Sequence, residues 1–220
     1  MDTVITIDGP SGGGKSTVSR AVAARLGYAY LDTGAMYRAV GLHARNLATD
    51  LDDDQQVQAM LDSVELSLTP GDGDTRVLLC GEDVSETIRT AEMGLVASRV
   101  SALPPVRAKL TELQRHIGAQ GHIVAEGRDM GTVVFPGAKG KFFLMASAEE
   151  RAERRVKQLA GKGEIVSHAE ILEQIEARDL ADSTRALAPL KPAADAVLID
   201  STSMEATEVV NFIIDQLAKK

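Results

Sequence analysis

The sequence has few of the residues that stabilise small secreted proteins or that stack on nucleic acid bases. Cys80 is the only cysteine, tryptophan is absent, and aromatic residues make up 3% of the 220 residues. One cysteine cannot form an intramolecular disulfide. Because Cys80 follows the apolar run Val77–Leu79, we expect a buried, inert thiol. The tyrosines are too few and too close together for an RNA-stacking platform: Tyr28, Tyr30 and Tyr37.

Long apolar runs and a basic surplus are also absent. No stretch approaches the roughly 20 apolar residues that span a bilayer, and Met1–Thr3 lacks the character of a signal peptide. Lys and Arg number 24 against 32 Asp and Glu, which gives a formal net charge of −8. A nucleic-acid binder normally carries a basic surplus, whereas a small phosphorylated substrate needs only a local cluster of arginines. We therefore expect a cytoplasmic protein with neither a membrane nor a nucleic acid polymer as its partner.

What is present is an alternation of short apolar runs with helical stretches. The composition, 44% hydrophobic and 25% charged, is that of an ordinary soluble protein with a sizeable core. The runs that read as buried strands are Val4–Ile7, Ala29–Leu31, His122–Ala125, Lys141–Met145 and Ala196–Ile199. Strands that alternate with helices predict an α/β fold whose core is a mainly parallel sheet flanked by helices.

One segment departs from this parallel pattern. Glu65–Leu68 alternates in polarity, the turn residues 70–74 follow, and Val77–Leu79 is apolar again, which predicts an antiparallel hairpin. We expect an inserted subdomain at residues 48–101 within a single domain of residues 1–220. A second feature is the glycine-rich tip at residues 161–163, between two predicted helices.

The strongest local motif is a phosphate-binding loop. Residues 9–16 fit the pattern G-x-x-x-x-G-K-[ST], between a predicted strand and a predicted helix. The glycines let successive backbone N–H groups point at phosphate oxygens, and the helix adds its positive end. Lys15 can bridge the β- and γ-phosphates of a nucleoside triphosphate, and Ser16 can place its hydroxyl on Mg²⁺. We therefore expect a nucleoside triphosphate and Mg²⁺ at a site made by Gly9, Pro10, Ser11, Gly12, Gly13, Gly14, Lys15, Ser16 and Thr17.

Two sets of charged residues have helical spacing. Arg178, Asp182 and Arg185 share one face if their helix continues that far, and a carboxylate between two guanidiniums suits a ribose hydroxyl beside phosphates. Arg151 and Arg155 precede the glycine-rich tip, where a moving lid would bring cations onto the transferring phosphoryl group. The alternative is that these arginines are solvated surface charges paired with neighbouring glutamates, above all Arg154.

Several segments together resemble the bacterial cytidylate kinases, in the same order and across nearly the whole chain. They are residues 9–17, 31–38, 81–85 with 88–89, 126–136 and 187–190, of which 126–136 is the most specific. The resemblance implies a P-loop nucleoside-monophosphate-kinase fold with an enlarged monophosphate-binding insertion and a short lid at residues 156–168. In that family Thr33 is often Ser and Glu126 is often Asp, which keeps the functional group, and many members have Gly at the place of Ser16.

The resemblance also implies roles for individual residues. Ser98, Arg107 and Asp129 would read the base, because a carboxylate can accept the cytosine N4 amine and would oppose the uracil carbonyl. Arg38 and Arg128 are the candidates for the acceptor phosphate, and Asp32 would contact either substrate or a magnesium-bound water. The remaining acceptor-binding residues are Thr33, Arg178, Asp182 and Arg185. From the sequence alone, Asp129 beside Arg128 is more simply a structural ion pair.

The expected activity is direct in-line transfer of the ATP γ-phosphoryl group to CMP or dCMP, by a monomer. Lys15, Arg128, Arg151, Arg155, Arg178 and Arg185 would stabilise the developing charge. Closure of the lid and the insertion would exclude water and suppress ATP hydrolysis. The alternatives are a kinase of UMP, AMP or shikimate on the same core, and a nucleotide-controlled switch. A switch GTPase would carry an Asn/Thr-Lys-x-Asp motif, and the sequence has none.

Overall fold

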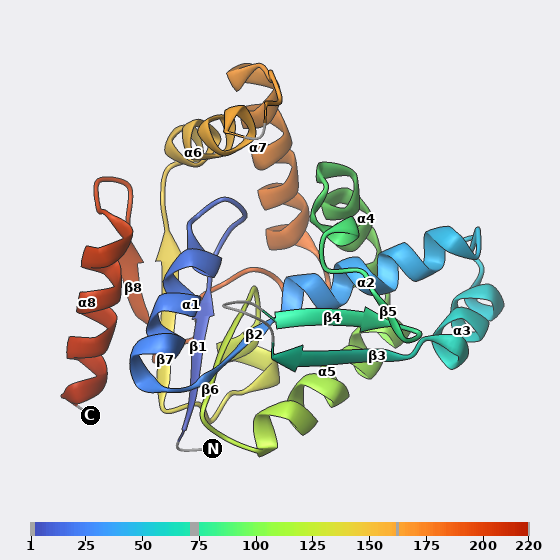
Figure 1. Ribbon diagram of the computed structural model, residues 1–220, viewed down its shortest axis with the longest axis horizontal. Helices are drawn as coiled ribbons and strands as arrows, with labels where there is room; N and C mark the ends of the chain where they lie inside the picture. Colours follow the sequence, from blue (N-terminus) through green and yellow to red (C-terminus); the bar gives the residue numbers. More distant parts are fainter. Residues whose placement is uncertain (1–2, 71–74, 162, 220) are drawn as a thin grey trace.

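The computed structural model describes residues 3–70, 75–161 and 163–219 of the chain. Its core is a five-stranded sheet in the order β2-β6-β1-β7-β8, in which every pair of neighbours is parallel (Figure 1). The strands are β1 (Val4–Asp8), β2 (Ala29–Asp32), β6 (Ile123–Gly127), β7 (Gly140–Met145) and β8 (Val197–Asp200). The expected parallel α/β core is therefore confirmed. All residues of β1 and β6 are buried, as the continuous apolar runs require when helices cover both faces of a sheet.

Helices form a layer on each face of this sheet (Figure 1). On one face lie α1 (Lys15–Leu26) and α8 (Ala206–Ala218), whose Val22 and Ile213 share a core with Ile7 and Leu144 of the strands. On the other face lie α2 (Thr33–Asn46) and α5 (Pro104–Ala119), which bury Met36 and Leu110. Pro104 suits the first turn of α5, where its missing N–H costs nothing.

A small antiparallel sheet projects beside α2. Its strands, in the order β3-β4-β5, are β3 (Leu66–Pro70), β4 (Thr75–Leu79) and β5 (Glu82–Asp83). The predicted antiparallel hairpin is thus confirmed, although residues 71–74 of its turn lie outside the described residues. The same stretch of chain also contains α3 (Asp54–Ser63), a 3₁₀ turn η1 (Thr87–Arg89) and α4 (Ala91–Ser101), which packs on α2. No pattern in the sequence predicted β5, η1 or α4.

The helices α6 (Ala148–Ala160) and α7 (His168–Thr184) lie above the end of β1 from which α1 begins (Figure 1). They bury Ala152, Leu159, Ile171 and Ile175 against each other in a separate apolar cluster. Lys162, at the centre of the predicted glycine-rich tip, lies outside the described residues. Among the helices that the structure describes, none combines the length and the apolar character needed to cross a membrane.

The prediction of a buried Cys80 was wrong, because the structure exposes this thiol. Val77 and Leu79 are the buried residues of β4. Because successive side chains of a strand point to opposite faces, Cys80 falls on the exposed face. The strand also ends at Leu79, and Cys80 adopts a left-handed backbone (φ 49°) that begins the turn through Gly81.

Candidate active site

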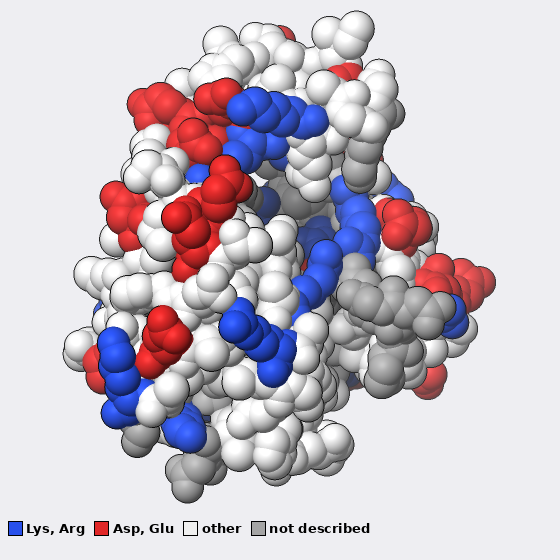
Figure 2. All heavy atoms as spheres, turned by 60° about the vertical axis from the view of Figure 1, so that its left-hand side comes forward, with Lys and Arg blue, Asp and Glu red and all other residues white. Residues whose placement is uncertain are grey.

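The parallel strands end at a cavity of about 160 Å³. Such a position is where open α/β sheets bind ligands, just outside the carboxyl ends of the strands. Figure 2 shows Lys and Arg side chains along the rim of a hollow, although acidic side chains cover much of the surface nearby. The predicted site residues that line the cavity are Ser11, Gly12, Lys15, Ser16, Asp32, Thr33, Arg38, Ser98, Arg107, Arg128, Asp129, Arg178, Asp182 and Arg185.

The phosphate-binding loop forms one wall. Gly9 has a φ of 148°, and a Cβ on it would stand 2.1 Å from the Leu144 carbonyl oxygen, so only glycine lets the chain pass β7 here. Gly14 precedes α1 with φ 80° and without a side-chain cap, which leaves the first N–H groups of the helix available to an anion. The buried Lys15 Nζ donates to the Pro10 carbonyl at 2.6 Å. Burial and, next, the charge of Arg128 lower the pKa of Lys15 to about 7.

Beside Lys15 lies a group of oxygen atoms suited to a hard cation. Ser16 Oγ donates to Glu126 Oε1 at 2.7 Å, while Glu126 Oε2 is buried without a hydrogen-bond partner among the described residues. Burial, followed by the nearby Asp32, raises the pKa of Glu126. The Asp32 side chain itself caps α2 through the Ala35 N–H and pairs with Arg38 at 3.1 Å. One or two carboxylates and a hydroxyl fit Mg²⁺, which keeps most of its water and phosphate ligands.

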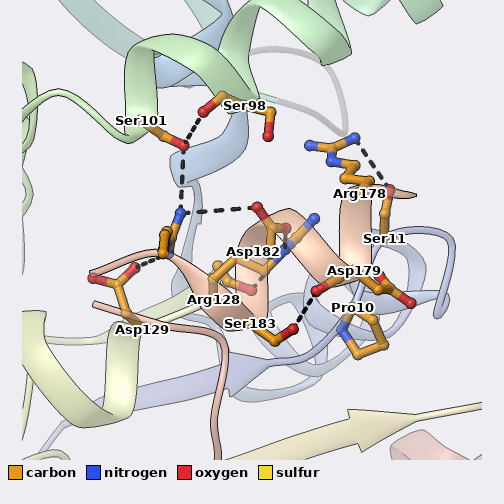
Figure 3. A network of polar contacts seen from close by, with 12 residues as sticks. Pro10, Ser11, Ser98, Ser101, Arg128, Asp129, Arg178, Asp179, Asp182 and Ser183 are labelled. Atoms are coloured by element: carbon orange, nitrogen blue, oxygen red, sulfur yellow. Dashed lines mark hydrogen bonds and ion pairs between the residues drawn. The ribbon is translucent and has the colours of Figure 1, made fainter. Parts of the chain in front are cut away.

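Arginines from distant parts of the chain form the opposite wall (Figure 3). Arg128 Nε donates to Asp182 at 2.8 Å, and Arg178 donates to the Ser11 hydroxyl of the phosphate-binding loop at 3.2 Å. Burial alone would raise the pKa of Asp182, but Arg128, Arg178 and Arg185 hold it below its usual range. Asp182 is thus an ionised carboxylate among guanidiniums, as the spacing suggested. The helix does not reach Arg185, because α7 ends at Thr184 and Arg185 follows it in extended backbone.

In the neighbouring part of the cavity, two other arginines hold the buried carboxylate of Asp129. Asp129 pairs with Arg107 and lies 3.9 Å from Arg185, and both arginines also contact Ser101. The simpler interpretation, an ion pair between Asp129 and Arg128, is wrong, because Arg128 turns to Asp182 instead. Ser98 lines the cavity and its carbonyl accepts from Ser101 Oγ at 2.8 Å.

Arg151 and Arg155 do not line this cavity. Arg151 is buried, donates to the carbonyls of Ala146 and Ser11, and pairs with Asp179 at 2.6 Å. Arg151 therefore braces the phosphate-binding loop from outside the cavity. Arg155 donates to Gln158 within its own helix. Arg154 pairs with Glu150, as expected of a surface charge, and also donates to the Ser201 carbonyl. Further predicted residues outside the lining are Gly9, Pro10, Gly13, Gly14 and Thr17.

Sequence reasoning missed several lining residues. Glu126 stood inside the most specific motif but received no role, although its place as the fourth residue of the buried strand β6 was a signal. Tyr37 was dismissed with the other tyrosines, yet its ring lies under the Arg107 guanidinium at 5.7 Å. Ser101, which bonds to both Arg107 and Arg185, carried no signal in the sequence.

Comparison with known proteins identifies relatives along the whole chain. Residues 5–219 match the family described as cytidylate kinase. The cytidylate kinase of Syntrophotalea carbinolica is 50% identical over 217 residues, 99% of this chain and 92% of that protein. Those of Carboxydothermus hydrogenoformans and Pasteurella multocida are 47% and 49% identical, covering 98% and 94% of this chain and 97% and 91% of theirs.

Among solved structures, an uncharacterised protein from Eubacterium ventriosum shares the fold, with a TM-score of 0.54 at 10% identity over both whole chains. This likeness concerns the fold alone. The family match and the identities near one half extend over both walls of the cavity, from the phosphate-binding loop to the arginines of α7. The chain therefore belongs to the cytidylate kinase family.

Proposed function

We propose that this protein is an ATP-dependent kinase that transfers the γ-phosphoryl group of ATP to CMP or dCMP, which gives ADP and CDP or dCDP. The observation that carries the proposal is a single cavity that joins a phosphate-binding loop to the Arg107–Asp129–Arg185 group. The first part suits a nucleoside triphosphate. The second offers a fixed carboxylate acceptor beside guanidinium donors, which suits the edge of a cytosine. Membership of the cytidylate kinase family supports the same conclusion.

On the donor side, the loop amides and Lys15 would hold the β- and γ-phosphates of ATP. Ser16, with Glu126 and Asp32 beside it, would hold Mg²⁺, which neutralises phosphate charge when bound. The lowered pKa of Lys15 fits this role, because bound phosphates replace the missing negative partner and favour the protonated amine.

On the acceptor side, Arg38 and Arg128 would bind the phosphate of CMP, and Asp182 would bind its ribose. Asp129 would accept the N4 amine of cytosine, with Arg107 and Ser98 completing the contacts to the base. Arg178 already spans the two sides, since it lines the cavity and touches Ser11 of the phosphate-binding loop. It is well placed to stabilise charge as the phosphoryl group passes between them.

The reaction needs alignment and charge neutralisation more than covalent catalysis, so we propose a direct in-line transfer. Closure of a lid at residues 156–168 and of the insertion at residues 48–101 would exclude water from the cavity. Arg155, at the edge of this lid, would approach the phosphates only in the closed form, while Arg151 would act through the loop that it braces. We further propose a monomer that works in the cytoplasm. The net charge of −8 supports small nucleotides over a nucleic acid polymer as its partners.

The test is to measure ADP release from ATP with each nucleoside monophosphate in turn, and with none. We expect fast release with CMP and dCMP, slower release with UMP and AMP, and little without an acceptor. Lys15→Ala should abolish the transfer without the loss of about 2–5 kcal/mol in stability that follows truncation of a core side chain, because burial already disfavours the charged amine. ADP release that is equally fast without any acceptor would contradict the kinase and favour a nucleotide-controlled switch.

A further inference from the structure

Asp8 is a buried carboxylate that the proposed chemistry does not use. It is the last residue of the central strand β1, and its backbone leads directly into Gly9 of the phosphate-binding loop. Its side chain is 4% exposed. Both carboxylate oxygens point across to the neighbouring strand's end: Oδ1 accepts the N–H of Met130 at 2.9 Å, and Oδ2 accepts the N–H of Gly131 at 2.8 Å.

These two N–H groups open the turn that follows Arg128 and Asp129. The turn, η2 (Met130–Val134), is a single π-helical turn, a rare conformation that is frequent at functional sites. Its first N–H groups have no partner within the turn, as at the start of any helix. Asp8 accepts hydrogen bonds from two of them at once, and so it ties the start of the turn to the end of β1.

Gly131 shows how closely the two segments approach. A Cβ on Gly131 would stand 3.0 Å from Thr6 Oγ1 and 3.4 Å from Asp8 Oδ2. The contact between the end of β1 and the turn is therefore tight, and a small change in the Asp8 side chain must move one of them. Close packing transmits such a shift instead of absorbing it.

Burial disfavours the ionised form of Asp8. Burial raises the pKa of Asp8 to about 6, against the opposing effect of its bonds to Gly131 and Met130. Among the charged groups, Asp129 raises the pKa further and Lys15 lowers it. Asparagine would avoid the burial of a charge, but its NH₂ group would face one of the two N–H donors and could not accept a hydrogen bond from it. A carboxylate is the side chain of this length that offers two acceptors.

We infer that Asp8 is a positioning residue that holds the acceptor-reading turn, with Arg128 and Asp129, in register with the phosphate-binding loop. The inference rests on the proposed function, since it assigns those two residues to CMP. Asp8 itself does not line the cavity. Its effect is on where the base and acceptor phosphate are held relative to the γ-phosphoryl group of ATP.

The test is steady-state kinetics of Asp8→Asn with CMP, UMP and ATP as the varied substrates. We expect the KM for CMP to rise about tenfold to hundredfold, as when one charge-assisted hydrogen bond is lost. The KM for ATP should stay within about twofold, because the loop amides and Lys15 are untouched. The preference for CMP over UMP should fall as well, since the carboxylate of Asp129 would no longer face the N4 amine squarely.

Val4→Ala is the matched control. Val4 is fully buried in the same strand and belongs to the apolar cluster that contains Met130 and Val134 of the turn, but its side chain makes no hydrogen bond to the turn. This substitution lowers stability but leaves the hydrogen bonds of Asp8 in place. We therefore expect both KM values and the CMP to UMP preference to remain those of the wild type. If Asp8→Asn does not fold, Gly131→Ala disturbs the same contact from the other side and should show the same split between the two KM values.

Three outcomes overturn the inference: wild-type kinetics of Asp8→Asn, an equal change in its KM values for CMP and ATP, or the same pattern in Val4→Ala. In each of these cases the wild-type enzyme still phosphorylates CMP, so the proposed function holds and only the role of Asp8 is overturned. A wild-type protein that neither phosphorylates CMP nor is stabilised by it against heat overturns both.

Discussion

At the scale of single residues, the cavity is built from carboxylates that burial would otherwise neutralise. Burial raises the pKa of Asp129, and Arg107 and Arg185 oppose that rise. The two arginines also orient the carboxylate, because each is itself held by Ser101. A carboxylate fixed in this way is an acceptor of defined direction, which is what discrimination between an amine and a carbonyl on a base requires.

Asp129→Asn should therefore weaken the choice of base. We expect kcat/KM for CMP to fall and that for UMP to fall much less or to rise, because the amide no longer repels the uracil carbonyl. A contact of this kind is worth about 1–3 kcal/mol, so the CMP to UMP preference should shrink by roughly 10- to 100-fold. Both substrates should be measured on one enzyme preparation.

The partners of Asp129 make this measurement cleaner. Its ion pairs are with Arg107 and Arg185, whereas Arg128, our candidate for the acceptor phosphate, is held by Asp182. Loss of Asp129 should therefore leave the phosphate contact of Arg128 in place. An unchanged preference, with both rates lowered together, would mean that Asp129 only supports the surrounding arginines.

At the scale of elements, the site depends on how closely β1 and β7 approach. Gly9 lies where β1 becomes the phosphate-binding loop, and its missing side chain leaves room for the Leu144 carbonyl at the end of β7. The loop must bend sharply at this point so that its N–H groups face inward. The glycine thus serves both the backbone conformation and the packing of the sheet.

Gly9→Ala should abolish ATP binding and destabilise the protein. A Cβ at 2.1 Å from a backbone oxygen cannot be accommodated without moving the loop, and overpacking of this kind typically costs about 1–3 kcal/mol or more. Denaturant unfolding and the binding of a fluorescent ATP analogue would measure the two effects.

Gly27→Ala is the control for this prediction. Gly27 ends α1 with a φ of 66°, so alanine meets a positive φ there too, in the left-handed region, but nothing lies within 4 Å of its Cβ. We expect a loss of about 1 kcal/mol and normal binding of the ATP analogue. Equal effects of the two substitutions would show that backbone strain, and not the contact with Leu144, explains the glycine at position 9.

At the scale of the whole molecule, the cavity gathers side chains from both ends of the chain. Arg128 and Asp182 are 54 residues apart, and Arg178 and Ser11 are 167 residues apart. The arginines concentrate positive charge in a protein of net charge −8, which favours anionic nucleotides at this one place. A ligand that touches all of these elements can bind only the fully folded molecule.

CMP should consequently raise the melting temperature. At a concentration of 100 times its Kd, a ligand stabilises a protein by about 2.7 kcal/mol, which corresponds to roughly 5–10 °C for a domain of this size. Arg178→Ala and Arg185→Ala should each lose most of this shift, because they remove a guanidinium from the cavity. Differential scanning fluorimetry with and without CMP would measure it.

Glu173→Ala provides the comparison, since Glu173 is exposed on the same helix as Arg178. It should keep the full shift. If the arginine variants and Glu173→Ala respond to CMP alike, the arginines of α7 are surface charges and the acceptor binds elsewhere.

The sequence by itself determined the features that depend on neighbours in the chain. The apolar runs predicted the parallel strands, because burial on both faces demands them, and the spacing of residues 9–16 predicted the phosphate-binding loop from local backbone chemistry. The spacing of Arg178, Asp182 and Arg185 also pointed to a ribose and its phosphates, but the base-reading residues were named only through resemblance to a family, since no local pattern distinguishes Ser98 or Arg107 from other helix residues.

The tertiary structure alone decided which charges meet. Adjacent residues Arg128 and Asp129 looked like partners, yet Asp129 pairs with Arg107 of α5 and Arg128 pairs with Asp182 near the end of α7. The exposure of Cys80 and the bond between Ser16 and Glu126 likewise follow from how strands end and which strands lie side by side. Contacts between distant residues depend on the packing of whole elements, and that information is not contained in any short stretch of sequence.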